Sequence, residues 1–289
     1  MSGAGENPIR NVSDTARWTA LFRARESERP DALFHDPFAR RLAGERGAQI
    51  AAAVRFAARN AWSFTARTVL FDRLIAAQVA AGADLIVNLA AGLDARPYRM
   101  DLPAALAWVE VDLPGILDYK EEVLAAATPR CRLERVRLDL ADGPARARLF
   151  ASLGERARRA VILAEGLLIY FEPPAVAALA RDLAAPPGFR YWITDLASPG
   201  LLQLMRKRMG REVEAAGAPF RFAPAAGPAF FEPCGWRARQ VLSPLQTAAQ
   251  VHRLPWNLRL FARFPQTHPG AHPRRPWSGV CELERAAQG

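Results

Sequence analysis

The chain has 289 residues, of which 51% are hydrophobic, so it is long enough to bury a substantial core in one large α/β unit. Its formal net charge of +10 comes almost entirely from arginines scattered along an alanine-rich sequence. Because nucleic acid or an anionic membrane would favour clustered positive charge, we expect neither partner and interpret these arginines as solvated helix faces.

Three cysteines, Cys131, Cys234 and Cys281, lie far apart without a CxxC pair, so neither a disulfide framework nor a zinc knuckle is indicated. His268 and His272 are each followed by a proline, and no carboxylate or cysteine completes a ligand set, so we expect no metal. The chain starts without an apolar signal segment and has no long uncharged apolar run, which indicates a cytoplasmic protein.

The first eighty residues are predicted to be helical. One helix is expected to begin at Ser13 or Asp14 and to end near Glu28, because these side chains can cap its first turn. A second helix is expected to open at Asp36, and the alanine-rich stretch 49–81 predicts one or two more.

After residue 84 the sequence changes to short apolar runs separated by helical patterns, which is typical of βαβ units and a parallel sheet. The predicted strands cover residues 85–89, 107–111, 133–138, 160–164 and 190–194. The predicted helices between them cover residues 114–127, 143–152 and 174–184. Further along, we expect an amphipathic helix over 200–216 and strands over 236–242 and 279–284.

The predicted fold class is α/β, a Rossmann-like sheet with helices on both faces. We divide it into an N-terminal helical cap over residues 1–83 and a main domain over 84–289, packed as one compact unit. The main domain carries a lid insertion at about 196–235. Right-handed crossovers in such a sheet leave a ligand crevice at the carboxyl ends of the strands.

Small residues directly follow the first predicted strand, at Ala90 and Gly92, and allow a close approach of the backbone to a ligand. Alone, such a turn more often reflects tight packing. Asp112 ends the next strand, where a carboxylate can accept hydrogen bonds from ribose hydroxyls. Asp139 and Glu165 end the third and fourth strands. Each acid singly is more simply a helix cap, but acidic ends on successive strands indicate a nucleotide-like cofactor.

These residues resemble the leucine carboxyl methyltransferase-like family of S-adenosylmethionine-dependent methyltransferases, which includes protein phosphatase methyltransferases and bacterial polyketide O-methyltransferases. The matching stretches follow family order and spacing over roughly residues 13–196. They are SDTA (13–16), the RPD and FHDPFA run (29–39), ART (66–68), AAGLDARPYRM (90–100), EVDLP (110–114), LDL (138–140) and AEGLLIYF (164–171).

The resemblance implies S-adenosyl-L-methionine as the cofactor. Asp112 is similar to the family's ribose ligand, and Asp139 and Leu140 are similar to its adenine contacts. Gly92 corresponds to its close-approach glycine, and Arg67 looks like the residue that holds the cofactor's carboxylate.

The family also places an acid, here Glu165, near the methionine moiety of the cofactor. In contrast, Ala90 and Ala95 replace the first glycine and the threonine of the usual Gly-Ala-Gly-Leu-Asp-Thr-Arg. The location of the site is implied by the resemblance, whereas the change at residue 90 leaves cofactor affinity open.

The predicted reaction is O-methylation of a carboxylate, or a hydroxyl, of a small-molecule metabolite. A carboxylate acceptor needs no general base, and none of the four histidines lies in a catalytic motif. A polyketide-type secondary metabolite is implied by the resemblance alone. Beyond proximity, the candidate catalytic side chains are Tyr98 and His35, and the candidates for holding the acceptor are Arg23, Tyr170 and Arg206.

Other interpretations remain open. The acceptor is alternatively a protein's C-terminal carboxylate, or the chain is a catalytically silent cofactor-binding module whose changes at Ala90 and Ala95 mark a degraded site. A nucleic-acid methyltransferase and a dehydrogenase rank lower, because Glu165-Gly166-Leu167-Leu168 follows the fourth strand. The aromatic residues of 230–264 either line an acceptor pocket or fill the core. Both a monomer and a homodimer are compatible with the sequence.

Overall fold

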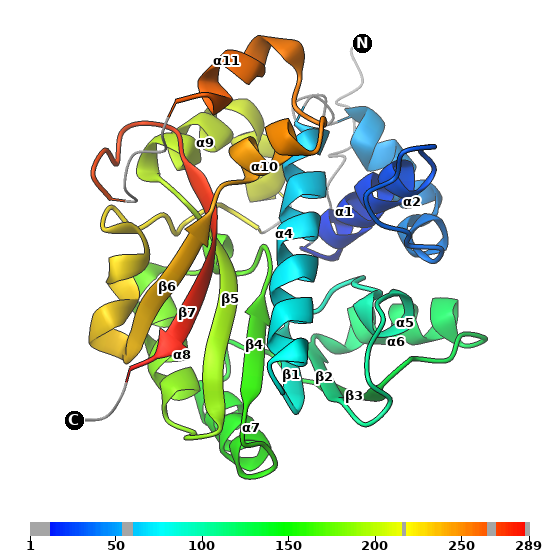
Figure 1. Ribbon diagram of the computed structural model, residues 1–289, viewed down its shortest axis with the longest axis vertical. Coiled ribbons are helices and arrows are strands. Elements are labelled where there is room, and N and C mark those ends of the chain that lie inside the picture. Colours follow the sequence, from blue (N-terminus) through cyan, green and yellow to red (C-terminus); the bar gives the residue numbers. More distant parts are fainter. Residues whose placement is uncertain (1–11, 54–59, 216–217, 265–269, 287–289) are drawn as a thin grey trace.

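The structure, a computed structural model, describes residues 12–53, 60–215, 218–264 and 270–286. A single mixed sheet of seven strands runs through the molecule, with helices on both faces (Figure 1). The predicted α/β, Rossmann-like fold class is therefore confirmed. His268 lies outside the described residues.

Strand order in the sheet is β3-β2-β1-β4-β5-β7-β6. The first five strands pair in parallel, whereas β7 is antiparallel to both β5 and β6. The order reverses between β1 and β4, and in open α/β sheets such a switch point is where ligands bind. The strands are β1 (Leu85–Leu89), β2 (Ala107–Asp112), β3 (Arg132–Arg137), β4 (Ala160–Ala164), β5 (Phe189–Ala197), β6 (Trp236–Leu242) and β7 (Ser278–Arg285).

Central strands β1 and β4 are buried along their whole length, which explains why their sequences, LIVNL and AVILA, read as continuous apolar runs. Helices α7 (Gly143–Glu155) and α8 (Pro173–Ala184) cover one face through a core that includes Phe150 and Leu179. Helix α4 covers the other face through a core that includes Phe71 and Trp108.

The helical preface consists of α1 (Val12–Ser27), α2 (Ala39–Ala53) and α4 (Ala61–Ala80). Because α4 packs on the sheet, the predicted boundary at residue 83 falls between a helix and the sheet that it covers. Only α1 and α2 sit apart from the sheet's faces, at the end where the parallel strands finish (Figure 1). Asp14 is not the predicted cap, because it lies inside α1 and pairs with Arg46 at 3.0 Å.

The predicted lid region contains α9 (Pro199–Ala215) and the 3-10 helix η2 (Gly227–Cys234), between β5 and β6. Several short helices were not predicted from the sequence, because three to seven residues give little periodicity. They are α5 (Arg96–Arg99), α10 (Pro244–Gln250) and α11 (Arg259–Ala262), with the 3-10 helices η1 (Leu168–Tyr170) and η3 (Trp256–Leu258). The remaining helix is α6 (Pro114–Leu124). No helix in the described ranges is long and apolar enough to cross a membrane.

Five of the six aromatic residues between 230 and 264 divide into two groups, and the sixth, Phe230, is partly buried against the main core. Phe231 and Trp236 are fully buried in the main core, as one of the two interpretations expected. Trp256, Phe261 and Phe264 are exposed, so they neither fill the core nor line a closed pocket.

We expect Trp236→Ala to lower the free energy of unfolding by about 3–5 kcal/mol, the usual cost of truncating a buried tryptophan. Trp236 has no exposed surface, packs edge-on against Trp192 at 5.6 Å, and donates a hydrogen bond to the carbonyl of Ala180 at 2.9 Å. Urea unfolding followed by circular dichroism measures the change. Arg237→Ala, at the exposed neighbouring position, is the control, and a loss below about 1 kcal/mol for Trp236→Ala would contradict the packing described.

Candidate functional site

The turn after β1 contains two residues in the left-handed backbone region. Ala90 has a φ of +50° and Gly92 a φ of +48°. A Cβ on Gly92 would also lie 3.3 Å from the Cβ of Ala16 on α1, so glycine is favoured there by both conformation and space. Ala90 adopts a conformation that costs a side-chain-bearing residue about 1–2 kcal/mol, yet the turn is formed.

Asp112, at the end of β2, fastens this turn to the neighbouring strand. Its Oδ2 accepts the backbone N–H of Gly92 at 2.6 Å, and its Oδ1 accepts that of Leu113 at 2.7 Å. Burial raises the pKa of this carboxyl, and the two backbone N–H groups oppose the shift. A carboxylate has about four acceptor positions, so Asp112 retains capacity for ligand hydroxyls.

Beneath Asp112, a buried ion-pair cluster braces β2. Glu110 and Lys120 have no exposed side-chain surface, and the Nζ of Lys120 lies 2.7 Å from Oε1 of Glu110. Arg135 on β3 donates to the other carboxylate oxygen at 2.9 Å. Removing one partner of such a pair leaves an uncompensated buried charge, so this cluster constrains where β2 ends.

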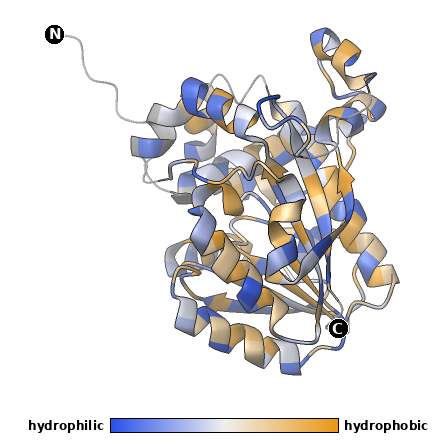
Figure 2. Ribbon diagram, turned by 90° about the vertical axis from the view of Figure 1, so that its left-hand side faces the viewer, coloured by the Kyte–Doolittle hydropathy of each residue, from blue (hydrophilic) through white to orange (hydrophobic). Residues whose placement is uncertain are grey.

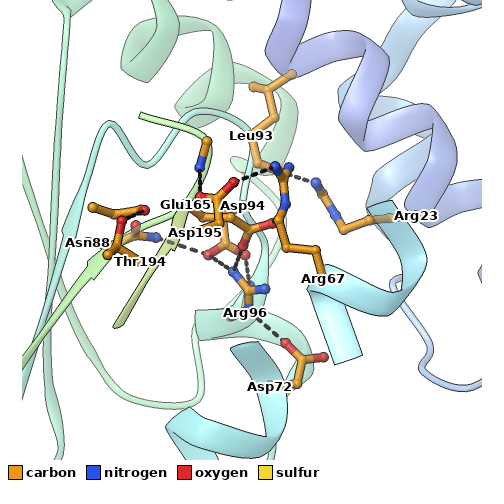
Figure 3. A network of polar contacts seen from close by, with 12 residues as sticks. Arg23, Arg67, Asp72, Asn88, Leu93, Asp94, Arg96, Glu165, Thr194 and Asp195 are labelled. Carbon is orange, nitrogen blue, oxygen red and sulfur yellow. Dashed lines mark hydrogen bonds and ion pairs between the residues drawn. The ribbon is translucent and has the colours of Figure 1, made fainter. Parts of the chain in front are cut away.

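Arg67 of α4 reaches the ends of β4 and β5 (Figure 3). Its Nε donates to Glu165 at 3.0 Å, and its Nη1 donates to Asp195 at 3.2 Å. Asp195 also accepts the backbone N–H of Gly166 at 2.6 Å, which ties β5 to the turn after β4. Burial lowers the pKa of Arg67, but the two carboxylates outweigh burial and raise the pKa overall.

Arg96, at the start of α5, lies at the centre of the same network (Figure 3). Its side chain is only 4% exposed and contacts three carboxylates: Asp72 of α4 at 2.6 Å, Asp94 at 2.9 Å and Glu165 at 2.9 Å. One guanidinium therefore joins the ends of β1 and β4 to the helix that covers them. Arg99 adds a two-pronged contact to Asp72, with both distances 2.8 Å.

Asp94, within the turn after β1, connects that turn to β1 and to the start of α5. Its Oδ2 accepts from the amide of Asn88 on β1, and its Oδ1 accepts the backbone N–H of Arg96, both at 2.9 Å. Burial would raise the pKa of Asp94, but the charges of Arg96, Lys120 and Arg23 hold it well below its usual range.

At the end of β3, Asp139 and Leu140 lie side by side with opposite exposure. Asp139 is exposed, and its Oδ1 accepts the N–H of Ala141 at 2.8 Å. Leu140 is buried, and its carbonyl accepts from Arg146 at 2.6 Å. An exposed carboxylate beside a buried leucine is suited to an adenine ring that is covered on one face and has its amino group at the edge.

The two candidate catalytic residues, Tyr98 and His35, are not part of the ion-pair network around Arg96. Tyr98 is buried, and its hydroxyl accepts a hydrogen bond from Arg135 at 2.7 Å while its ring packs edge-on against Phe38. Tyr98 follows the turn in sequence, but α5 directs its side chain toward Arg135 of β3. His35 is exposed on the loop between α1 and α2.

Two of the three candidate acceptor-binding residues are occupied by protein partners. Arg23 pairs with Asp36 at 2.9 Å and donates to the carbonyl of Leu93, so it fastens α1 to the turn. Arg206 donates to the carbonyl of Phe220 and holds α9 to the following segment. Both arginines are therefore structural ties in this conformation.

Tyr170, the third candidate, faces the network. Its hydroxyl shares a side-chain hydrogen bond with Thr15 of α1, and its ring lies 5.8 Å from that of Phe220. Burial raises the pKa of the Tyr170 hydroxyl, while the charges of Arg67 and Asp195 act on it in opposite directions. It thus joins the turn after β4 to the helix above it.

Sequence reasoning missed Asp195 and Asp72 and assigned no role to Asp94. Asp195 follows the same pattern that identified Asp112 and Glu165, an acid at the carboxyl end of a buried strand, and could have been found on that basis. Asp72 was visible in the sequence only as a carboxylate within a mostly apolar helix, and nothing there indicated which basic residues it would pair with.

Comparisons with known proteins show what the chain is similar to. Residues 16–184 match the family model described as leucine carboxyl methyltransferase. A protein of Parafrankia sp. (strain EAN1pec), named as an S-adenosyl-L-methionine-dependent methyltransferase, is 35% identical over 250 residues, which is 80% of this chain and 78% of that one. A protein of the same description from Mycobacteroides abscessus is 37% identical over 188 residues, or 60% of this chain and 61% of the relative.

Among solved structures, a DUF574 family protein from Streptomyces avermitilis is similar with a TM-score of 0.60 and 16% identity. The match covers 94% of this chain and 97% of that one. At this identity the likeness concerns the fold, and it extends to the C-terminal third that the sequence motifs did not reach.

The stability that Asp94 contributes should depend on pH. Its pKa is depressed in the folded protein, so its contribution is present above the unfolded value of about 3.9 and is lost as the pH falls below it. We expect Asp94→Asn to be less stable than the wild type at pH 7, and the gap to narrow as the pH drops below about 4. Urea unfolding at several pH values measures the gap, and a gap that is independent of pH would contradict the ion pairs.

Proposed function

Since the chain belongs to the leucine carboxyl methyltransferase family of S-adenosylmethionine-dependent methyltransferases, we propose that it methylates a carboxylate oxygen of a small, apolar metabolite. Membership of this family establishes S-adenosylmethionine as the cofactor and methyl transfer as the type of reaction. The acceptor is our inference, and it rests on the aromatic cluster beside Arg67 and on the absence of histidine from the described network.

The residues at the strand ends fit the cofactor. A Cβ at Gly92 would lie only 3.3 Å from Ala16 and on a left-handed backbone, so glycine is favoured where the ligand is proposed to approach the backbone. In the proposal, Asp112 holds the ribose, Asp139 and Leu140 the adenine, and Arg67 the carboxylate. Bound S-adenosylmethionine supplies an electrophilic methyl group.

We place the methyl acceptor beside a cluster of aromatic rings next to Arg67. Its guanidinium carbon lies 5.3 Å from the ring centre of Phe64. Phe64 stacks on Phe22 at 4.9 Å and lies 5.6 Å from Trp18, both on α1. Trp18 and Phe22 are buried in the core, and Phe64 is partly buried. In the proposal, Phe64 lies beside the hydrophobic body of the acceptor, and Tyr170 is close to its acidic end.

A carboxylate is already nucleophilic, so such a reaction requires alignment and water exclusion, not proton removal. Within the described ranges, the ion-pair network around Arg96 contains no histidine; His35, His252 and His272 are all exposed. Tyr170, whose pKa is raised by burial, is suited to donate a hydrogen bond to the acceptor and poorly suited to act as a base.

Helix α1 bears on the alternative of a protein C-terminus as acceptor. Ala16 meets the Gly92 turn and Arg23 bonds to Leu93, so α1 lies directly over the site. A closed cover favours a small acceptor over a polypeptide end, which needs an open funnel. The silent-module alternative rests on Ala90 and Ala95. The unfavourable φ of Ala90 has not prevented the turn from forming, and Ala95 is buried.

The proposal includes a role in secondary metabolism and a cytoplasmic location, with no nucleic acid as a partner. The three cysteines are free and buried, as is usual in a reducing compartment. Some exposed arginines are ion-paired within the chain, such as Arg40 with Glu28 and Arg137 with Glu121, so the charge of these arginines is balanced without a nucleic acid.

The test offers the protein methyl-labelled S-adenosylmethionine with matched sets of acceptors. Each set has one apolar skeleton bearing a carboxylate, an alcohol or a phenol, and a peptide with a free C-terminus is included. We expect methyl esters of the acids, identified by mass spectrometry and lost on mild alkaline hydrolysis. Asp112→Ala, the control, should reduce turnover at low cofactor concentration by about 10–100-fold, the cost of losing charge-assisted hydrogen bonds. Products from alcohols or peptides alone would refute the proposal.

A further inference from the structure

An exposed apolar patch, formed by residues 256–264, stands outside the catalytic machinery. Four large side chains there are mostly solvent-exposed: Trp256 (83%), Leu260 (62%), Phe261 (61%) and Phe264 (61%). Across the described residues, Leu113 is the one other large hydrophobic side chain with comparable exposure, at 44%. Clustered exposure of this kind marks an interaction surface, whereas scattered apolar residues do not.

This patch is not a loosely attached part of the core. On the opposite side of the same segment, Leu258 and Ala262 pack against a small buried cluster that contains Leu254 and Ala248. The segment thus has one apolar side anchored to α10 and α4 and a second apolar side directed outward. Figure 2 shows it projecting from the top of the molecule, with hydrophobic and hydrophilic residues interleaved.

Charge identifies the kind of surface that the patch fits. Arg259 and Arg263 are exposed between the apolar side chains. The sequence from residue 233 to 281 contains no aspartate or glutamate, and its arginines are Arg237, Arg239, Arg253, Arg259, Arg263, Arg274 and Arg275. Tryptophan, phenylalanine and leucine combined with arginine are the composition of segments that lie in the headgroup region of anionic bilayers.

Position supports a functional role for the patch. The parallel strands end at the top of the view in Figure 1, and α11 lies at that same end with α1, α9 and α10. If this end of the molecule faced a bilayer, the candidate site would also face the bilayer, where an apolar metabolite would be concentrated.

We propose that the patch of residues 256–264 docks onto an anionic lipid surface. Trp256, Leu260, Phe261 and Phe264 enter the headgroup region, and Arg259 and Arg263 pair with lipid phosphates. This peripheral attachment differs from the sequence-based expectation of no membrane partner, because only the folded chain brings the apolar and basic side chains to one exposed surface. A second copy of the chain fits less well, since its patch would place arginine against arginine.

Vesicle flotation tests the proposal, with vesicles of phosphatidylcholine alone or mixed with phosphatidylglycerol. We expect the wild type to float with the mixed vesicles and much less with the neutral ones. The double variant Leu260→Ser with Phe261→Ser should lose binding by about tenfold or more, since both changes remove inserted apolar surface. Both positions are exposed, so thermal unfolding should stay unchanged and confirm that the variant is folded.

Arginine variants separate the patch from the general positive charge. Arg259→Ala with Arg263→Ala should weaken binding by about 30-fold, because each lipid-facing charge contributes roughly fivefold. Arg132→Ala with Arg237→Ala removes the same charge from exposed positions outside the patch and should leave binding nearly unchanged.

Three results would overturn the docking proposal. The first is no flotation of the wild type with either vesicle, and the second is flotation that the serine variant retains. The third is an equal loss for both arginine pairs, which would assign binding to overall charge. If sedimentation also showed a dimer that the serine variant dissociates, the patch would belong to a second copy of the chain.

Discussion

The guanidinium of Arg96 is the contact on which the site depends. It is almost completely buried and pairs with three carboxylates that come from α4, from the turn after β1 and from the end of β4. A buried guanidinium is tolerable only when its charge is matched in this way, and the carboxylates in turn need the arginine. Each element is therefore held where the others require it, which places a polar, preorganised set of groups at the switch point of the sheet.

The rest of the architecture surrounds that contact. Arg67 extends the network to β5 through Asp195, and Asp112 fastens the end of β2 to the Gly92 turn. Helix α1 then covers the turn through Ala16 and Arg23, and its aromatic residues supply the apolar side. The polar groups at the strand ends and the apolar residues of α1 thus belong to one set of packed elements.

Most of the sheet could be predicted from the sequence, because strands buried on both faces read as uninterrupted apolar runs and their boundaries differed by only a few residues. Asp112 and Glu165 could be proposed as site residues from their positions at strand ends, and Arg67 from the family resemblance. The ion-pair partners could not, since Asp72 and Asp94 meet Arg96 only after α4 has packed on the sheet. Tyr98 shows the converse problem: sequence proximity to the turn does not reveal that a short helix directs its side chain elsewhere. The outward apolar side of residues 256–264 was likewise indistinguishable from core, because burial is a property of the tertiary fold.

Calorimetric titration of Arg96→Met with S-adenosylhomocysteine, next to the wild type and Arg99→Met, tests the central role of Arg96 most directly. Arg99 contributes to Asp72 but does not bond to the strand-end carboxylates Asp94 and Glu165, so its variant should stay within a few fold of wild-type affinity. For Arg96→Met we predict a dissociation constant raised by about 10–100-fold, the cost of losing charged hydrogen bonds that position the site. Thermal unfolding of each sample verifies that it is folded. Wild-type affinity in a folded Arg96→Met protein would show that the cofactor site forms without this network.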